Sequence, residues 1–223
     1  MTDRQRTRWF MLLIPVFLSL GLIVSACSSD DEVTSTHEPD PESESASNNA
    51  ADEPRGLLHD LPQTAPEIEL TDHEGNPFRL SDHQGRVVAM FFGYTHCPDI
   101  CPLTLMHMQD ATLELGEDAR DALFLFITVD PEQDTPEQMA RYVGRVETEV
   151  IGLTGDREEL ERVWEAYDIT VEIEPRDDDS YLISHSAQIW VLNQQGQAVM
   201  VLPPNADGVD MAHDIRWLLD RPS

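Results

Sequence analysis

The 223-residue sequence contains no lysine, and all 14 of its basic residues are arginines. Because 43 Asp and Glu residues oppose them, the formal net charge is -29 at pH 7. Such a chain is a poor partner for nucleic acid, whose phosphates require a basic surface. The acidic residues are spread along the chain, which favours a solvated surface. Electrostatic steering of a cationic partner is the alternative interpretation of the same charge.

Residues 28 to about 56 contain no aromatic residue, and Val33 is their one apolar β-branched residue. Such a segment cannot bury enough apolar surface to offset the entropy lost on ordering. We therefore expect residues 27–56 to form a disordered tether. The remainder, 57–223, shows no internal repeat and has the ordinary length of one domain with its own core.

The first 26 residues have the pattern of a secretory signal: three arginines precede an uncharged run, Trp9–Ala26, and Cys27 follows. The residues Val24–Cys27 also resemble a bacterial lipoprotein signal, in which Cys27 becomes the lipidated first residue. An uncleaved anchor is the alternative, because a run of about 18 residues is at the short end of the range that spans a bilayer. Both interpretations place the rest of the chain at a bacterial cell membrane, facing the periplasm or the extracytoplasmic side, where thiols are oxidised.

Only three cysteines are present, and two of them, Cys97 and Cys101, lie in the run FFGYTHCPDICP at residues 91–102. An apolar run typical of a strand, 87–92, precedes the pair, and a run typical of a helix follows it. Three residues separate the sulfurs, whereas a dithiol redox motif has two. In the first turn of a helix this spacing directs both sulfurs along one face and leaves room for a metal ion and a third ligand. Thiols at helix N-termini are acidified and reactive, which favours a functional pair over two buried core cysteines.

Apolar runs, helix caps and turns predict alternating strands and helices, then a hairpin and a last helix. The predicted elements are a hairpin at 68–80; strands at 87–92, 122–129 and 150–153; helices from the cysteine pair to 115, from 136, and from the Asp156 cap to 167; a hairpin at 181–202; and a helix at 209–219. The run 122–129 is apolar throughout, as expected of a strand that is buried on both faces. We therefore predict an α/β, thioredoxin-like fold with a central mixed sheet flanked by helices.

Of the eight histidines, His185 is the candidate for a third ligand. It follows an irregular acidic loop, 174–180, at a point that a thioredoxin-type sheet brings up beside the cysteine turn. Two thiolates and one imidazole form a soft site that suits Cu(I). From position alone, a surface or hydrogen-bonded histidine is the commoner role, so this alternative stays open.

Three segments of the sequence resemble the Sco (SenC) family of copper-binding assembly proteins for cytochrome c oxidase. They are residues 91–102, the run TVDPEQDTP at 128–136, and the run HSA at 185–187, in the family's order over most of 66–221. The resemblance implies a thioredoxin-like fold and copper held by Cys97, Cys101 and His185. The two thiolates suit Cu(I), and His185 would also allow Cu(II) to bind. It also implies delivery of copper to the CuA centre of an oxidase subunit, or reduction of its thiols. The expected partners are that subunit, another copper-donating chaperone or a thiol reductase, and the membrane.

Other positions near these segments have two interpretations each. Asp130 and Asp134 follow the run 122–129 at the sheet edge where ligands bind, and the resemblance implies that they tune the site or dock partners. A turn plus a helix cap is the equally weighted alternative. The family often has an acidic residue where Ser184 stands. The run Met106–Met108 suggests an accessory copper site. The favoured alternative is that Met106 and Met108 pack or half-pack on the helix while His107 is exposed.

The expected function is that of a membrane-tethered copper chaperone that assists assembly of the CuA centre. The alternative is a thiol-disulfide oxidoreductase that reduces the CuA-site cysteines or other extracytoplasmic thiols. That chemistry requires Cys97 and Cys101 to cycle through a disulfide, but it does not require His185. A peroxidase-like thiol enzyme and a copper sensor are weaker alternatives.

Overall fold

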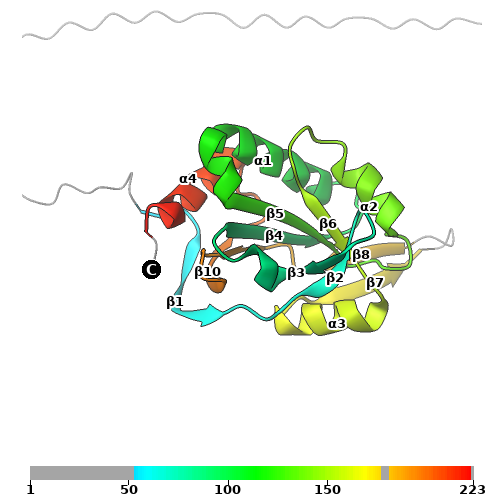
Figure 1. The fold of residues 1–223 in the computed structure, drawn as a ribbon. Coiled ribbons are helices and arrows are strands. Elements are labelled where there is room, and N and C mark those ends of the chain that lie inside the picture. Colours follow the sequence, from blue (N-terminus) through cyan, green and yellow to red (C-terminus); the bar gives the residue numbers. More distant parts are fainter. Residues whose placement is uncertain (1–52, 177–180, 222–223) are drawn as a thin grey trace, which may run out of the picture. The chain divides into compact units, whose positions relative to one another are not determined.

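A computed structural model of the chain describes residues 53–176 and 181–221, without the side chains of 60–62 (Figure 1). Its strands are β1 Leu57–Thr64, β2 Glu69–Asp72, β3 Pro77–Arg79, β4 Val87–Gly93, β5 Ala122–Thr128, β6 Ile151–Thr154, β7 Val171–Pro175, β8 Tyr181–His185, β9 Ile189–Leu192 and β10 Gln197–Leu202. Its α-helices are α1 Ile100–Leu115, α2 Pro136–Val143, α3 Arg157–Ala166 and α4 Gly208–Leu219, and two short 3-10 helices span Leu80–His83 and Gly116–Asp121.

Eight strands form a mixed sheet in the order β1-β10-β9-β4-β5-β6-β2-β3. Strands β4, β5 and β6 are parallel to one another, and β9 and β2 flank them antiparallel. Figure 1 shows α1 and α4 on one face of this sheet and α3 on the other. Every residue of β4 and β5 is buried between these layers, which explains why both strands are continuous apolar runs.

The helix boundaries follow from local signals that the sequence displays. The Thr135 side chain caps α2 by accepting from the Gln138 N–H, and Pro136 occupies the first helical position. Asp156 and Glu159 form a reciprocal capping box at α3. Gly116 ends α1 with a positive φ of 60°. The predicted ends of these three helices are therefore confirmed to within one or two residues.

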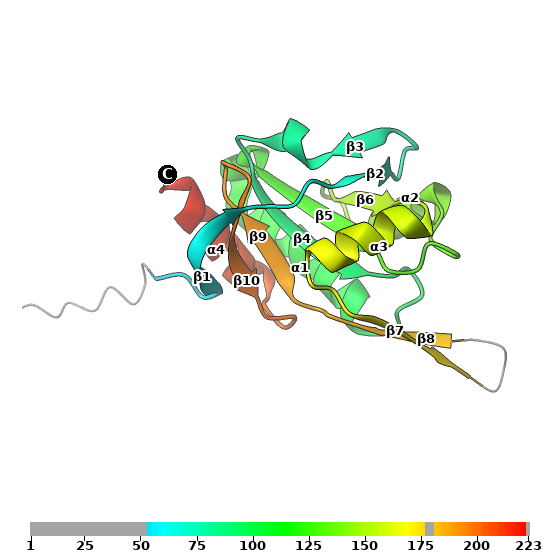
Figure 2. The same ribbon diagram turned by 90° about the horizontal axis from the view of Figure 1, so that it is seen from below.

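The segment 181–202 departs from the prediction of a single hairpin. Its first strand is broken into β8 and β9, and only β9 belongs to the main sheet. Strand β8 pairs with β7 in a separate two-stranded sheet that projects from the body (Figure 2). Residues 174 and 175 end β7 instead of beginning an irregular acidic loop; the strand is largely exposed and rich in glutamate, which explains the difference from the prediction. Strand β1, which no sequence pattern predicted, lies at the sheet edge against β10.

The N-terminal end of the described part is attached to α4. The buried Asp214 carboxylate accepts the backbone N–H of Arg55 at 2.8 Å and that of Gly56 at 2.7 Å. The folded part therefore holds two residues that precede the predicted domain start at 57. The predicted signal, Cys27 and most of the tether lie outside the described residues. Within 53–176 and 181–221, no helix is both long enough and apolar enough to cross a bilayer.

Candidate metal centre

The cysteine turn connects the C-terminal end of β4 to the start of α1. Helix α1 begins at Ile100, so only Cys101 lies in its first turn, and Cys97 precedes the helix. The prediction that both cysteines lie in the first turn is therefore wrong for Cys97, because Asp99 rather than a residue before Cys97 is the N-cap. Cys101 is completely buried, whereas Cys97 is partly exposed. Both are free thiols. One sulfur is thus accessible to a partner, and the other faces the core.

The two thiols share a hydrogen bond that separates their pKa values. Donation from the Cys101 thiol is the largest cause that lowers the pKa of Cys97 to about 5, and the backbone N–H groups of Asp99 and Cys101 add to it against the effect of burial. The same hydrogen bond, followed by burial, raises the pKa of Cys101. At neutral pH the pair therefore consists of a thiolate at Cys97 and a thiol at Cys101.

His185, at the end of β8, points its Nε2 atom at Cys101, 3.9 Å from Sγ. Its Nδ1 atom lies 2.9 Å from the backbone carbonyl oxygen of Ser186. Because a carbonyl only accepts, Nδ1 carries a proton, and in the neutral ring Nε2 keeps its lone pair toward the sulfur. The rings of Phe91 and Tyr94 pack edge-on against the imidazole, with 6.1 and 6.0 Å between ring centroids. The Ser186 carbonyl orients the ring, as outer contacts of metal-ligating histidines commonly do.

These donors can approach a single soft ion. Metal–sulfur and metal–nitrogen bonds add up to about 4.3 Å, so a sulfur and a nitrogen separated by 3.9 Å can both reach one metal. Sulfur with imidazole nitrogen is a donor set that suits Cu(I). In the described ranges, however, no three His, Cys, Asp or Glu side chains already form a complete ligand set. Cys101 contacts both other candidates, and the three would have to draw closer around an ion.

Asp134 lies beneath the cysteine turn. Its buried carboxylate accepts the Thr95 hydroxyl at 2.6 Å, the Thr95 N–H at 3.1 Å and the Thr128 hydroxyl at 2.6 Å. Burial is the largest cause of its raised pKa. Asp134 thereby ties the start of the turn to the end of β5. It does not cap α2, a role that belongs to Thr135.

Asp130 lies at the same sheet edge but binds the hairpin that carries His185. The Tyr181 hydroxyl donates to its two carboxylate oxygens at 2.8 and 3.0 Å. Asp130 is 2% exposed, and burial is the largest cause of its raised pKa. None of the hydrogen bonds described for Asp130 or Asp134 reaches Cys97, Cys101 or His185. The hydrogen bonds of both aspartates therefore hold the elements around the site, and the charge of Asp134 also contributes to the raised pKa of Cys101.

The run Met106–Met108 does not converge on one point. Met108 is fully buried, whereas Met106 is 56% exposed on another side of α1. His107 is partly buried, and its Nδ1 atom is enclosed without a hydrogen-bond partner. The favoured hypothesis fits Met108, which packs, and Met106, which is about half exposed, but it is wrong for His107, which is partly buried. Successive helical residues point about 100° apart, which explains the divergence.

Gly93 is a site residue that the sequence analysis did not single out. A Cβ atom there would lie 3.0 Å from the Cys101 Sγ and 2.8 and 2.9 Å from the rings of Phe91 and Phe126. A glycine within an apolar strand run is the available signal, because it often marks a close approach by another group. Tyr181 was also missed, because its partner Asp130 is remote in sequence.

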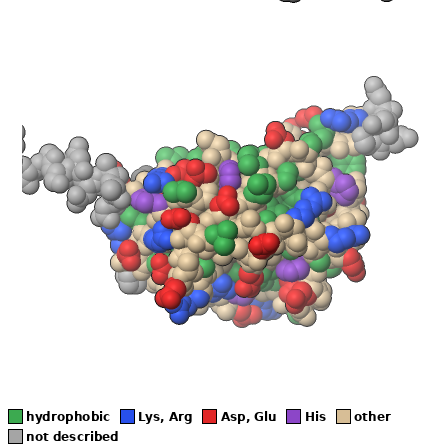
Figure 3. Space-filling view, turned by 90° about the horizontal axis from the view of Figure 1, so that it is seen from above, with side chains coloured by type: hydrophobic (Ala, Val, Ile, Leu, Met, Phe, Trp, Pro, Cys, Tyr) green, Lys and Arg blue, Asp and Glu red, His purple; other side chains and the backbone are tan. Residues whose placement is uncertain are grey.

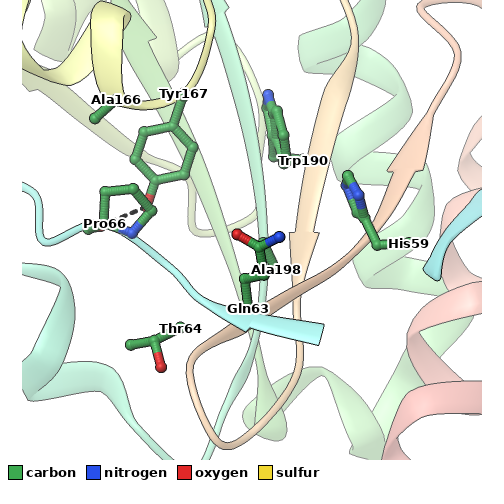
Figure 4. A pocket seen from close by; sticks show the side chains of 8 residues that line it. All are labelled: His59, Gln63, Thr64, Pro66, Ala166, Tyr167, Trp190 and Ala198. Carbon is green, nitrogen blue, oxygen red and sulfur yellow. Dashed lines mark hydrogen bonds between the residues drawn. The ribbon is translucent and has the colours of Figure 1, made fainter. Parts of the chain in front are cut away.

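Elsewhere among residues 53–176 and 181–221, no group of three His, Cys, Asp or Glu side chains forms a competing centre. In Figure 3, Asp and Glu side chains are interspersed with arginines over the face seen from above Figure 1, which fits a solvated surface. A cavity of about 180 Å³ lies where β1 and β10 approach α3, with His59 stacked on Trp190 at 5.4 Å (Figure 4). Its lining contains no cysteine and one histidine, so it lacks the donors of a soft-metal site.

Comparison with known proteins gives consistent matches. The SCO1/SenC family model matches residues 59–220. Protein SCO2 homolog, mitochondrial, from Mus musculus is 39% identical over 133 residues, which are 58% of this chain and 52% of that protein. A putative copper-binding protein from Stutzerimonas stutzeri is 35% identical over 146 residues, which are 65% of this chain and 72% of that protein. This chain spans about half to three fifths of the length of the mammalian and yeast relatives it matches.

Among solved structures, that of Bradyrhizobium japonicum ScoI with copper bound is similar, with a TM-score of 0.65 and 31% identity. The match covers 69% of this chain and 98% of that one. It confirms the predicted fold class, a thioredoxin-like α/β fold with a mixed sheet flanked by helices.

Proposed function

This chain belongs to the SCO1/SenC family, and from that premise we propose that it is a copper chaperone which assists assembly of the CuA centre of cytochrome c oxidase. We assign Cys97, Cys101 and His185 as the ligands of its copper cargo. One observation carries this assignment: His185 Nε2 faces the Cys101 sulfur at 3.9 Å while the Ser186 carbonyl holds Nδ1. That orientation presents the Nε2 atom to the Cys101 sulfur. A histidine with a purely structural role has no need of it.

The protonation state of the pair suits capture of Cu(I). Cys97 is partly exposed and already a thiolate at neutral pH, so it meets the incoming ion first. Cys101 then loses its proton as it binds, because the thiolate is the ligand. His185 Nε2, which faces the Cys101 sulfur, completes the ligand set. Cu(I) is released by ligand exchange with the cysteines and histidines of the acceptor subunit, and Cu(II) is a second form that the imidazole allows.

Attachment to a membrane is part of this proposal. Residues 1–26 would be a lipoprotein-type signal, Cys27 the lipidated residue, 27–56 the tether and 57–223 the copper-binding domain. This arrangement would hold the domain on the extracytoplasmic side of a bacterial membrane, where an oxidase exposes its CuA subunit. The Cys27→Ala variant should move from the membrane fraction to the soluble fraction. Retention in the membrane would favour an uncleaved anchor.

The test is a Cu(I) titration of the reduced full-length chain against a competing chelator, in a Cys27→Ala background that removes the third thiol. We expect one tightly bound Cu(I) per chain. Cys97→Ser and Cys101→Ser should abolish tight binding, and His185→Ala should weaken it by about 10–100-fold. His96→Ala is the matched control, because His96 adjoins the pair but is exposed. Unchanged affinity in Cys101→Ser would overturn the assignment.

A thiol-disulfide oxidoreductase is the second candidate, and the asymmetry of the two thiols favours it. The accessible Cys97 thiolate would attack a partner's disulfide and form a mixed disulfide. The buried Cys101 would then displace the partner as a dithiol, leaving a Cys97–Cys101 disulfide that a dithiol reductant must reduce. His185→Ala should spare this reaction while it weakens copper binding. Reductase activity without tight copper would replace the chaperone proposal.

A further inference from the structure

His185 is carried by an element that has little packing of its own. Strands β7 and β8 form a two-stranded sheet apart from the main sheet, and Figure 2 shows them projecting from the body. Among the residues of these two strands, only Ile183 is buried. A lone hairpin is at best marginally stable in water. The position of His185 therefore depends on what attaches β8 to the body.

Alternate residues of β8 supply these attachments from one face of the strand. At the far end, the Tyr181 hydroxyl donates to Asp130 at 2.8 Å. In the middle, Ile183 is buried, and its N–H donates to the Tyr94 hydroxyl at 3.5 Å. At the near end lies His185, 3.9 Å from the Cys101 sulfur.

We propose that Tyr181 and Asp130 form a clasp that positions His185 over the cysteine pair. The inference rests on the proposed function, because it gives the clasp a role in copper binding. Tyr181 and His185 are four residues apart, or about 13 Å along an extended strand. Ile183 lies midway between them. If Tyr181 is freed, the strand can pivot about Ile183, and His185 at the other end of the strand is displaced from Cys101. Tyr181 is thus a positioning residue, and copper does not touch it.

The receiving side of the clasp is rigid. The Asp130 N–H donates to the Thr128 hydroxyl at 2.8 Å, which fixes its backbone to the end of β5. The Gln133 side chain donates to the Tyr181 oxygen at 2.8 Å, so the hydroxyl is held from two sides. In the same loop, between Asp130 and Gln133 in the sequence, Glu132 forms an ion pair with Arg157 of α3. The loop therefore cannot follow the hairpin if the hairpin moves away.

The first experiment measures Cu(I) affinity of the full-length chain for Tyr181→Phe, with His185 intact and in a His185→Ala background. With His185 intact we expect affinity to fall about tenfold. In the His185→Ala background the same change should have no further effect, because Tyr181 acts only through His185. An equal loss in both backgrounds would mean general destabilisation and would overturn the proposal.

Matched variants separate the clasp from other effects. Tyr167→Phe removes a hydroxyl that donates to the Pro66 carbonyl at 2.6 Å, away from the hairpin, and should leave copper affinity unchanged. Asp130→Asn keeps an oxygen acceptor for Tyr181 and should retain most of the affinity, whereas Asp130→Ala should match Tyr181→Phe. Equal losses in Asp130→Asn and Asp130→Ala would point to charge rather than positioning and would refute the clasp.

A metal-free measurement keeps this proposal distinct from the assignment of function. Hydrogen exchange of the peptide covering 181–186 should be several-fold faster in Tyr181→Phe than in wild type, while the β4 and β5 amides exchange unchanged. Unaltered exchange at 181–186 would refute the clasp. If His185→Ala left copper affinity unaffected, the ligand assignment would fail, and faster exchange in Tyr181→Phe would still establish that Tyr181 holds the hairpin.

Discussion

The thiolate at Cys97 leads to a prediction about reactivity that differs from the usual expectation for an acidic cysteine. We consider alkylation of the reduced, metal-free chain by iodoacetamide as a function of pH. The midpoint of the rate should lie near the Cys97 pKa of about 5. Above about pH 6, the rate should become independent of pH. An ordinary thiol continues to gain reactivity up to about pH 9, because its pKa is near 8.5.

The expected magnitude at pH 7 follows from two opposing effects. A pKa of about 5 leaves roughly 99% of Cys97 ionised, against about 3% for an unperturbed thiol. This difference raises the rate about 30-fold. Thiolate nucleophilicity falls with pKa by a Brønsted coefficient of about 0.4–0.5, so a difference of about 3.5 units lowers it roughly 40-fold. The two nearly cancel, and Cys97 should react at pH 7 about as fast as a free thiol.

The informative perturbation is Cys101→Ala, which removes the thiol donor that is the largest cause of the low pKa. The midpoint should rise but stay below 8.5, because the N–H groups of Asp99 and of position 101 still donate to the sulfur. Mass spectrometry of the peptide that contains Cys97 separates its signal from that of Cys27. Cys97→Ser is the control, since the buried Cys101 should then remain unmodified in the native chain.

Two results would refute this reasoning. A wild-type midpoint above pH 7.5 would mean that the hydrogen bonds to Cys97 are absent in solution. Faster modification of Cys101 than of Cys97 would mean that the assignment of the accessible and buried thiols is reversed. Either result would also remove the argument that Cys97 is the first ligand to meet copper.

Three further predictions follow from the packing around the site. Gly93→Ala should destabilise the fold by about 1–3 kcal/mol, because the added methyl group overpacks the core. It should also weaken Cu(I) binding by displacing the Cys101 sulfur. An unchanged free energy of unfolding in urea would contradict the close contacts around Gly93. Asp134→Ala should cost about 1–3 kcal/mol, because the Thr95 hydroxyl and N–H lose their acceptor. A thermal melt like that of wild type would exclude this. The pKa of Cys97 is lower in the folded chain than in the unfolded one, so its stabilising effect is present above the unfolded value and disappears as pH falls toward about 5. Stability of the reduced chain should therefore rise from pH 5 to pH 8, and Cys97→Ser should abolish that component.

Most of the fold could be predicted because its signals are local. Strands β4 and β5 are continuous apolar runs, and the caps of α2 and α3 mark their first turns. Strands β1 and β7 could not be predicted in the same way. Strand β7 is largely exposed and rich in glutamate, so it lacks the alternation of a half-buried strand. It forms a strand because β8 pairs with it.

The candidate site divides in a similar manner. Cys97 and Cys101 are placed at a strand-to-helix turn by an apolar strand run before them and a helical run after them. These signals are contiguous in sequence. The position of His185 made it a candidate third ligand, and the resemblance to the Sco family strengthened that assignment, but no local pattern shows which way an imidazole points. Its orientation depends on the Ser186 carbonyl, on the break between β8 and β9, and on attachment of the hairpin to Asp130.

The sequence by itself determined the α/β architecture, the helix ends and the position of the thiol pair, because short-range periodicity and capping encode them within a few residues. Only the tertiary structure decided that Asp134 braces the cysteine turn, that Asp130 binds Tyr181, and that Cys97 rather than Cys101 carries the thiolate. These properties depend on burial and on hydrogen bonds between residues that are distant in the chain. Folding alone brings such groups together, and hydrogen bonds and burial then shift their pKa values.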